Sequence, residues 1–321
     1  MELAPGSGPP NLRRSVVMLA SVLYRGLRTF GILSLARLLQ DAGVILCYHN
    51  VAPITDQVGA GEPSLHMPLP TFERQMRWLT VSCELVTLSE FVRRLQAGQP
   101  LRRLGAVTFD DGYRGVFEHA WPLLRALDIP ATVFVVADAP GQSNGFWWDH
   151  PIARRATTRS RRQEWLGDLR GDGEAILRSL HPGAPSAALP ASHLPAGWDV
   201  IRRAVASGMS LGVHSATHRS LPRLADAELR HELIRSRDVI ARETHVRPEF
   251  FAYPYGLWDQ RVQRAVQAAG YRGAVTLDRG LNRVGADSWT LRRVNVPAGI
   301  HESAFQAWVS GLALRRIAHD V

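Results

Sequence analysis

The stretch from Thr108 to Tyr113 reads Thr-Phe-Asp-Asp-Gly-Tyr, and it holds the strongest local signal in this chain of 321 residues. An apolar run ends there in two adjacent carboxylates, Asp110 and Asp111, and a glycine turn follows. Neighbouring side chains on a strand point to opposite faces, but a turn at the strand's end lets both carboxylates approach one site. The alternative is that both acids cap the helical pattern over 115–127, which leaves the second acid without a role.

Short apolar runs of the same kind recur along the chain, and their β-branched and aromatic side chains predict buried strands. These runs are Val44–His49, Ala106–Asp110, Thr132–Val136, Leu211–His214, Phe250–Tyr253, Ala274–Thr276 and Leu291–Val294. Helical patterns lie between them, over Phe72–Leu79, Phe91–Leu95, Gly115–Leu127, Ala225–Thr244, Asp259–Ala269 and Ser303–Ala318. We expect Thr71 and Ser89 to cap the first two helices.

Strands that alternate with helices predict βαβ units and a parallel sheet, and therefore an α/β protein. Seven or eight repeats of that unit suggest a closed barrel, in which chemistry sits at the C-terminal ends of the strands. The polar residues that end the apolar runs are therefore the first candidates for a site. They are His49, Asp110, His214 and Tyr253.

Two regions depart from this alternation of strands and helices. Residues 1–40 carry five arginines and one acid, and we treat them as a basic amphipathic helical segment before a barrel domain over 41–321. Such a helix could lie on an anionic membrane, pack on the domain that follows, or serve as an uncleaved export signal. The second region, an insertion over about 145–197, joins an arginine-rich helical stretch to a proline-rich loop.

The composition excludes several protein classes. Hydrophobic residues make up 45% and charged residues 21% of the chain, which does not fit a collagen, a disulfide scaffold or a disordered protein. The formal net charge is +9, and all 38 basic residues are arginine. A GC-rich genome explains the missing lysine most simply, and an anionic partner is the alternative. The arginines are dispersed, which argues against a nucleic-acid partner.

A second signal follows another predicted strand and reads His-Ser-Ala-Thr-His over residues 214–218. Two histidines four residues apart share one face of a helical turn, which suits two imidazoles that bind one metal. A third ligand is needed, and Asp111 could supply it. An Asp/His/His set with open positions suits zinc, and iron in a two-histidine, one-carboxylate triad is the chemical alternative.

A third signal ends a further strand with Tyr253-Pro254-Tyr255-Gly256. Taken alone, this stretch is typical of a core strand with a turn. At the mouth of a barrel, its aromatic side chains and a backbone N–H could form one wall of a sugar site.

Together these motifs resemble the polysaccharide deacetylase family, also called the NodB-homology or carbohydrate esterase 4 family. The likeness runs in the family's order over most of Val44–Pro297. Residues 48–51, 146–149 and 293–294 resemble the branch that acts on bacterial exopolysaccharides or glycan precursors. The resemblance implies a distorted (β/α)7-type barrel and metal-dependent removal of N- or O-acetyl groups from sugars.

The resemblance also implies roles for individual residues. Asp110 matches the catalytic base, and Tyr255 matches the position whose backbone N–H helps to hold an oxyanion. Asp111, His214 and His218 match the metal ligands, for zinc or alternatively cobalt, nickel or iron. Three further residues are expected to contact substrate: Tyr253, Trp148 and Asp149.

The chain departs from the family pattern at two places. The third motif usually begins with an arginine that pairs with the base, and Ala252 stands there instead. We expect Arg293, at the end of a later strand, to supply the missing cation. The family's late Leu-x-His motif, which provides the general acid, has no clear match. His49 could reach the site as a proton donor or substrate contact, or it could be a buried structural histidine.

The leading hypothesis is a hydrolase that removes acetyl groups, most readily N-acetyl groups, from a sugar, polysaccharide or lipid- or nucleotide-linked glycan. The alternatives are a glycan-binding barrel without activity and a related metal amidase that acts on a small amide. A binding protein has no need of the base, so intact Asp110 argues for an enzyme. We expect the chain in the cytoplasm or peripheral to the inner membrane through residues 1–40, with export as the alternative.

Overall fold

The computed structural model describes residues 26, 39–56, 61–180 and 189–312. The chain divides into two compact units, and Asp41–Gly299 forms the larger one. The smaller unit combines Met1–Gln40 with Ile300–Val321. The expected amphipathic helix over 1–40 and the start of the expected proline-rich loop at 181–188 lie outside the described residues.

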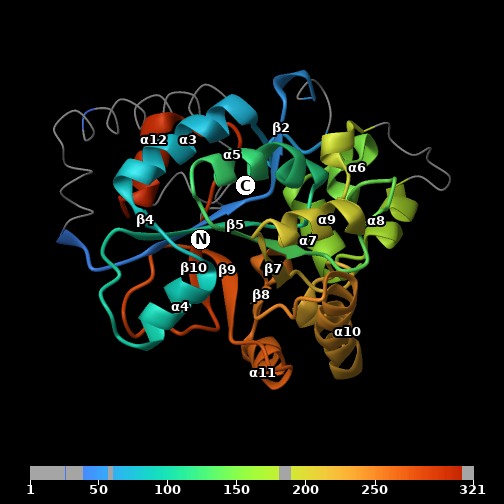
Figure 1. The fold of residues 1–321 in the computed structure, drawn as a ribbon. Coiled ribbons are helices and arrows are strands. Elements are labelled where there is room, and N and C mark those ends of the chain that lie inside the picture. The colour runs from blue at the N-terminus through green and yellow to red at the C-terminus, as the bar shows by residue number, and fades with distance from the viewer. Residues whose placement is uncertain (1–25, 27–38, 57–60, 181–188, 313–321) are drawn as a thin grey trace, which may run out of the picture. The chain divides into compact units, whose positions relative to one another are not determined.

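Seven parallel strands close into a barrel in the larger unit, as expected. The first strand, β1, pairs with both β5 and β10, and this double pairing completes the ring. The barrel strands are β1 (Val44–Tyr48), β5 (Leu104–Phe109), β6 (Ala131–Val135), β7 (Ser210–Val213), β8 (Phe250–Ala252), β9 (Gly273–Arg279) and β10 (Leu291–Asn295). Figure 1 shows them at the centre of this unit.

Three short strands accompany the barrel, and the apolar pattern did not predict them. The strand β4 (Glu84–Leu85) extends the sheet beside the start of β5. The strands β2 (Asn50–Ala52) and β3 (His66–Pro68) form a separate parallel pair. These strands have only two or three residues and include Asn50, His66 and Glu84, so they show neither an alternation nor an apolar run.

Helices connect most successive strands of the barrel, but none lies between β9 and β10, over the described residues 280–290. Their bounds are α3 (Leu69–Ser82), α4 (Leu88–Gln96), α5 (Trp121–Ala126), α9 (Trp198–Ala206), α10 (Asp226–Thr244) and α11 (Gln260–Ala268). Figure 1 shows α4, α10 and α11 outside the barrel. Single turns lie at η1 (Ile54–Asp56), η2 (Val116–Ala120), η5 (Leu221–Arg223) and η6 (Pro254–Gly256).

Both expected helix caps are wrong by a few residues. The helix α3 begins before Thr71, because Pro70 occupies one of the first helical positions, where its missing N–H costs nothing. The helix α4 is capped by Thr87 rather than Ser89, and the Thr87 hydroxyl accepts the Glu90 N–H at 3.1 Å. The Ser89 hydroxyl instead donates to Glu249 at 2.8 Å.

The insertion consists of short helical pieces, as its arginine-rich part predicted. They are η3 (Trp147–Asp149), α6 (Pro151–Ala156), α7 (Arg159–Gly167), α8 (Gly173–Leu180) and η4 (Ala191–His193). In the smaller unit, the last described helix is α12 (Glu302–Val309). It ends earlier than the expected Ala318, because Gly311 adopts a positive φ of 72° just beyond it. No helix among the described residues is long and apolar enough to cross a membrane.

Four of the barrel strands, β1, β5, β6 and β8, are buried on both faces, which explains why their sequences are continuous apolar runs rather than alternating ones. All residues of β1, β5 and β6 are buried. One cluster of the core joins residues of several strands to the inner face of α4, where Phe91 and Leu95 are buried. Each fully buried apolar side chain of this size contributes about 1.5–3 kcal/mol to the free energy of unfolding, so this packing holds the strand ends in place.

Candidate metal centre and active site

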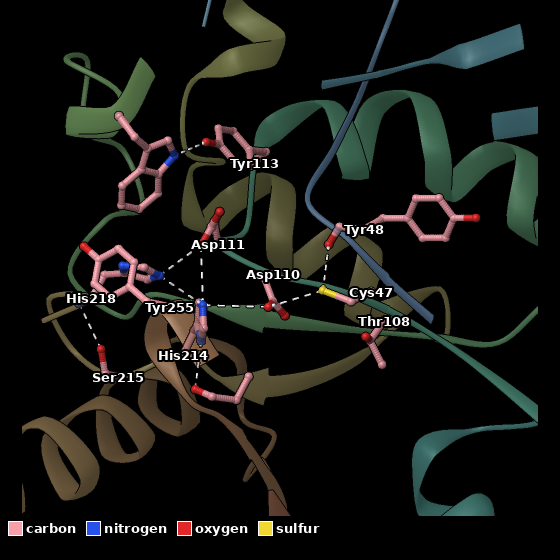
Figure 2. A network of polar contacts seen from close by, with 12 residues as sticks. Cys47, Tyr48, Thr108, Asp110, Asp111, Tyr113, His214, Ser215, His218 and Tyr255 are labelled. Carbon is pink, nitrogen blue, oxygen red and sulfur yellow. Dashed lines mark hydrogen bonds and ion pairs between the residues drawn. The ribbon is translucent and has the colours of Figure 1, made fainter. Parts of the chain in front are cut away.

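Three side chains from the ends of two barrel strands converge on one point. Asp111 follows β5, and His214 and His218 follow β7. The two Nε2 atoms lie 3.1 Å apart, and Asp111 Oδ1 lies 3.5 Å from His214 Nε2 and 3.4 Å from His218 Nε2. Figure 2 shows the three groups pointing toward one another. The structure thus brings together the three residues expected as metal ligands.

These spacings fit one tetrahedral metal ion. Two ligand atoms at about 2.0–2.2 Å from a zinc ion lie roughly 3.3–3.6 Å apart, close to the distances within the triad. His214 Nδ1 lies 2.8 Å from the carbonyl oxygen of Ala252, a bond that leaves Nε2 as the lone-pair nitrogen. Burial lowers the pKa of His214 and, together with His214, that of His218, so both imidazoles are neutral ligands.

The charge balance of the site also fits a cation. Burial and the neighbouring Asp110 raise the pKa of Asp111 well above its usual range. The single buried arginine nearby pairs with Asp110, which leaves the charge of Asp111 without a partner of its own. A cation held by the triad would neutralise that carboxylate.

Four residues at the rim of the barrel adopt left-handed backbone angles that are uncommon for non-glycine residues. They are Asp111 (φ 72°), Ser215 (φ 62°), His218 (φ 59°) and Tyr255 (φ 57°). Each such conformation costs about 1–3 kcal/mol and persists only where the surroundings enforce it. Their concentration around one point indicates that the strand ends are shaped for a site rather than for stability.

The loop that carries both histidines is held by Glu232, a residue that the sequence patterns did not single out. This buried carboxylate on α10 accepts the N–H groups of Ala216 and Thr217, each at 2.9 Å, and the Thr217 hydroxyl at 2.6 Å. The Ser215 hydroxyl accepts the N–H of His218 at 2.9 Å. The sequence did hold one sign of this role, because Glu232 is an acid next to the apolar Leu233 on the buried face of a predicted helix.

Arg293 and Asp110 form a buried bidentate ion pair. The guanidinium donates from Nη1 to Oδ1 at 2.7 Å and from Nη2 to Oδ2 at 2.6 Å, and both side chains are at most 2% exposed. Arg293 Nε also donates to the carbonyl of Thr276 at 2.8 Å, which fixes its orientation. Burial by itself raises the pKa of Asp110, but the guanidinium outweighs it and holds this pKa well below its usual range.

Cys47 and His49 lie close to Asp110. The thiol of Cys47 donates to Asp110 Oδ2 at 3.4 Å, as Figure 2 shows. Cys47, His49 and Asp110 each offer a ligand atom within 4.8 Å of the others. Both oxygens of Asp110 already bind Arg293, so this group suits a second cation poorly. Burial lowers the pKa of His49 to about 4, so its imidazole is neutral at pH 7.

Aromatic side chains wall the triad on one side. The ring of Trp148 lies 4.7 Å from that of His218, and the ring of Tyr255 meets His218 edge-on at 4.4 Å. The indole N–H of Trp147 donates to the Tyr255 hydroxyl at 3.1 Å. The insertion therefore supplies one wall of the site and η6 another. Trp148, an expected substrate contact, lies in the first wall and is 9% exposed.

Two expected substrate contacts face the interior instead. Tyr253 is fully buried, and its hydroxyl donates to the carbonyl of Trp289 at 2.9 Å. Asp149 is also fully buried, and it accepts the Tyr113 hydroxyl at 2.6 Å and the Glu62 N–H at 2.6 Å. Neither side chain fits a direct contact with substrate, because its polar atoms already bind protein groups away from the surface.

Asp149 belongs to a buried polar network that includes Tyr113. The Tyr113 hydroxyl accepts the indole N–H of Trp148 at 2.8 Å. Asp149 Oδ1 lies 2.9 Å from His66 Nε2, and the ring of His66 stacks on that of His193 at 3.7 Å between centroids. Neither ring nitrogen of His193 has a hydrogen-bond partner within the part of the chain that the structure describes. The network holds the insertion, and with it Trp148, in place beside the triad.

Comparisons with known proteins agree with this geometry. YxkH of Bacillus subtilis, a presumed polysaccharide deacetylase by its name, is 23% identical over 270 residues, which cover 84% of this chain and 76% of YxkH. A poly-β-1,6-N-acetyl-D-glucosamine N-deacetylase of Staphylococcus aureus is 34% identical over 74 residues, 23% of this chain and 26% of that protein. The structure of IcaB from Ammonifex degensii is 22% identical and superposes with a TM-score of 0.59, covering 84% of this chain and 98% of IcaB.

The strongest of these comparisons concerns the family as a whole. The sequence model of the polysaccharide deacetylase family matches residues 98–274, which is more than half of the chain. This segment contains the paired aspartates, both histidines of the triad and Tyr255. The chain therefore belongs to the polysaccharide deacetylase family.

Proposed function

We propose that this protein is a metal-dependent hydrolase that removes N-acetyl groups from a glycan or glycan precursor. One observation carries the proposal: a buried Asp110–Arg293 pair lies directly beside the Asp111, His214 and His218 triad at the C-terminal end of the barrel. A pure binding protein has no use for a buried, ionised carboxylate next to a metal site, because burying an ion pair is costly.

The triad is the proposed binding site for zinc, with cobalt, nickel or iron as alternatives. Two neutral imidazoles and one carboxylate form a donor set that zinc prefers, and three protein ligands leave a position open, as in catalytic sites. Once bound, the ion would lower the pKa of a water molecule and polarise the acetyl carbonyl group.

Asp110 is the proposed general base. Arg293 keeps its carboxylate ionised and fixed in direction, so that it can accept a proton from water during attack on the acetyl carbon. Such catalysis typically contributes about 10²–10⁴-fold to the rate. His49 remains the candidate for contact with the leaving amine, and because its imidazole is neutral it would donate a ring N–H.

The backbone N–H of Tyr255 is the proposed donor to the oxyanion that forms on the acetyl carbon. Two features support this role. Its left-handed backbone and the packing of its ring against His218 fix the η6 turn beside the triad. A preorganised donor of this kind lowers the barrier by about 2.7–4 kcal/mol in well-studied enzymes.

The N-acetyl group is proposed as the target because one relative is named as an N-deacetylase of poly-β-1,6-N-acetyl-D-glucosamine. That similarity covers 23% of this chain, so the exopolysaccharide or glycan-precursor substrate is part of the proposal. Trp148 and Tyr255 would offer apolar ring faces to the sugar next to the triad.

The test measures acetate released from N-acetylglucosamine oligomers by protein loaded with zinc or cobalt. Wild-type protein should release acetate, and Asp110→Asn should lose nearly all of this activity. Asp199→Asn, on an exposed aspartate of α9, is the matched control and should be unaffected. Equal release by wild type and Asp110→Asn would overturn the proposed mechanism.

Metal analysis tests the ligands separately from activity. His214→Ala should no longer retain zinc after dialysis, whereas His231→Ala, on an exposed face of α10, should retain it fully. Stoichiometric zinc in His214→Ala would contradict the proposed ligand set. Zinc loading without acetate release from any N-acetylated sugar would favour the glycan-binding alternative.

A further inference from the structure

A groove of about 770 Å³ runs beside the proposed active site. One wall is the helix α7 of the insertion, and the other is formed by the two loops that follow His218 and Tyr255. Its lining residues are Arg159, Arg162, Gln163, Leu166, Gly167, Ser220, Pro222, Arg223, Leu257, Trp258 and Asp259. Positive side chains therefore outnumber acidic ones along this surface.

The three arginines of the groove, Arg159, Arg162 and Arg223, are exposed. Among the described residues, none of the three forms an ion pair or a side-chain hydrogen bond. The acid of the groove, Asp259, is occupied, because its Oδ1 accepts the Val262 N–H at 2.8 Å and caps α11. With three arginines and one aspartate in its lining, the groove carries an excess of positive charge.

Other arginines of the chain behave differently. Arg93 and Arg94 bind Glu90, and Arg235 binds Asp138. Such pairs use up the donors of the guanidinium group and leave little charge for a ligand. The groove differs from these sites because three arginines without an ion pair to any described residue line one surface there.

Two hydrogen bonds connect the loops of the groove and of the proposed active site to the insertion. Ser220 lies two residues after His218, and its N–H donates to the carbonyl of Arg170 at 2.8 Å, which ties this loop to the insertion. The Tyr255 hydroxyl donates to the carbonyl of Gly171 at 3.3 Å. Burial raises the pKa of Tyr255, and the nearby Arg162 guanidinium partly opposes this effect. A glycan bound at the triad would thus extend past Tyr255 into the groove.

We propose that the groove binds an oxyanion, a phosphate or a carboxylate, carried by the same N-acetylated glycan whose acetyl group lies at the triad. The proposal rests on the deacetylase function proposed above. Guanidinium groups bind such oxyanions through two parallel hydrogen bonds, and arginine stays charged at every relevant pH. Trp258, half-buried in the groove, offers an indole face to a sugar ring. The substrate class is therefore an anionic or phosphate-linked N-acetylated glycan.

The test compares two triple variants of the full-length, zinc-loaded protein. The groove variant carries Arg159→Gln, Arg162→Gln and Arg223→Gln. The control variant removes the same charge from three exposed arginines that form no ion pair in the described part of the chain: Arg74→Gln, Arg102→Gln and Arg125→Gln. The probes are chitotetraose, which is neutral, a hyaluronan tetrasaccharide, which carries carboxylates, and UDP-N-acetylglucosamine, which carries a pyrophosphate.

Binding is measured by calorimetry and acetate release by initial rates. For at least one anionic probe, we expect the groove variant to raise the dissociation constant and lower kcat/KM about 30-fold or more. Chitotetraose should change by less than about 3-fold, and the control variant should resemble wild type. The anionic probe that responds identifies phosphate or carboxylate as the ligand.

Failure of the two proposals can be told apart. If groove and control variants bind both anionic probes equally, the groove proposal is wrong, even when acetate release from chitotetraose is normal. If the groove variant alone loses anion binding but wild type releases no acetate, the groove binds the anion as proposed and the deacetylase function is wrong.

Discussion

Replacing Arg293 with methionine should both destabilise the protein and inactivate it. Arg293→Met keeps most of the side-chain volume but leaves Asp110 buried without its partner. Both groups are at most 2% exposed, and two short hydrogen bonds of 2.7 and 2.6 Å are lost. Breaking a buried pair in this way costs about 3–5 kcal/mol.

The size of this effect can be measured as a change in melting temperature. In a domain of this size, 1 kcal/mol corresponds to about 2–4 °C, so Tm should fall by roughly 6–20 °C. The control is Arg77→Met, which breaks a pair with Glu73 whose partners are 60% and 40% exposed. An exposed pair contributes about 0–1 kcal/mol, so this control should barely move Tm.

A double variant separates the charge from simple loss of packing. Asp110→Asn combined with Arg293→Met removes the unpaired carboxylate and should melt at a higher temperature than Arg293→Met alone. Acetate release should be low in both Arg293→Met and the double variant, because each lacks an ionised, oriented base. The reasoning is refuted if Arg293→Met melts within 2 °C of Arg77→Met, or if it keeps wild-type kcat/KM.

Three further predictions follow from the surroundings of the site. Glu232→Gln should weaken zinc affinity about 10–100-fold in a chelator competition, because the loop with both histidines loses its charged acceptor; unchanged affinity would contradict this. Burial lowers the pKa of His193 to about 4. Between about pH 6.5 and 4, this histidine is therefore protonated in the unfolded chain but neutral in the folded protein. The free energy of unfolding should therefore fall as the pH drops through this range. The urea midpoint of His193→Phe should fall less than that of wild type over the same range. The titratable groups around this ring are Asp56, Asp149 and His66. Asp149→Asn should lower Tm while leaving KM for chitotetraose within about 2-fold, whereas a large rise in KM would restore Asp149 as a substrate contact.

The barrel itself could be predicted because its evidence is local. The barrel strands are buried over all or most of their length, so each appears as an apolar run that ends within a few residues of the predicted boundary. The residues after these runs point to the C-terminal rim of the barrel, where Asp111, His214 and His218 do converge. Helix caps were less predictable. Thr71 and Ser89 are both good capping residues, but α3 begins before Thr71 with a proline in its first turn, and Thr87 caps α4.

Side-chain partners from distant segments depended on the tertiary structure. The pairing of Arg293 with Asp110 joins positions 183 residues apart, and the sequence could only nominate it among 38 arginines. Glu232 reaches the histidine loop from α10, a contact that no spacing in the sequence reveals. Tyr253 and Asp149 show the reverse case, since their residue types suit a sugar site but their hydroxyl and carboxylate bind protein groups in the interior.

The sequence alone therefore predicted the barrel strands, the order of the motifs and the donor atoms of the triad, because these depend on residue type and near neighbours. The packing of strands and helices decides the remaining features. It decides which arginines have no ion pair, which polar groups face the interior and which acid holds the histidine loop. The groove of Arg159, Arg162 and Arg223 is the clearest case, since α7 and η5 meet only in the folded chain. Burial and desolvation are properties of that packing, and they decide whether a carboxylate is suited to act as a base, as a metal ligand or as a structural support.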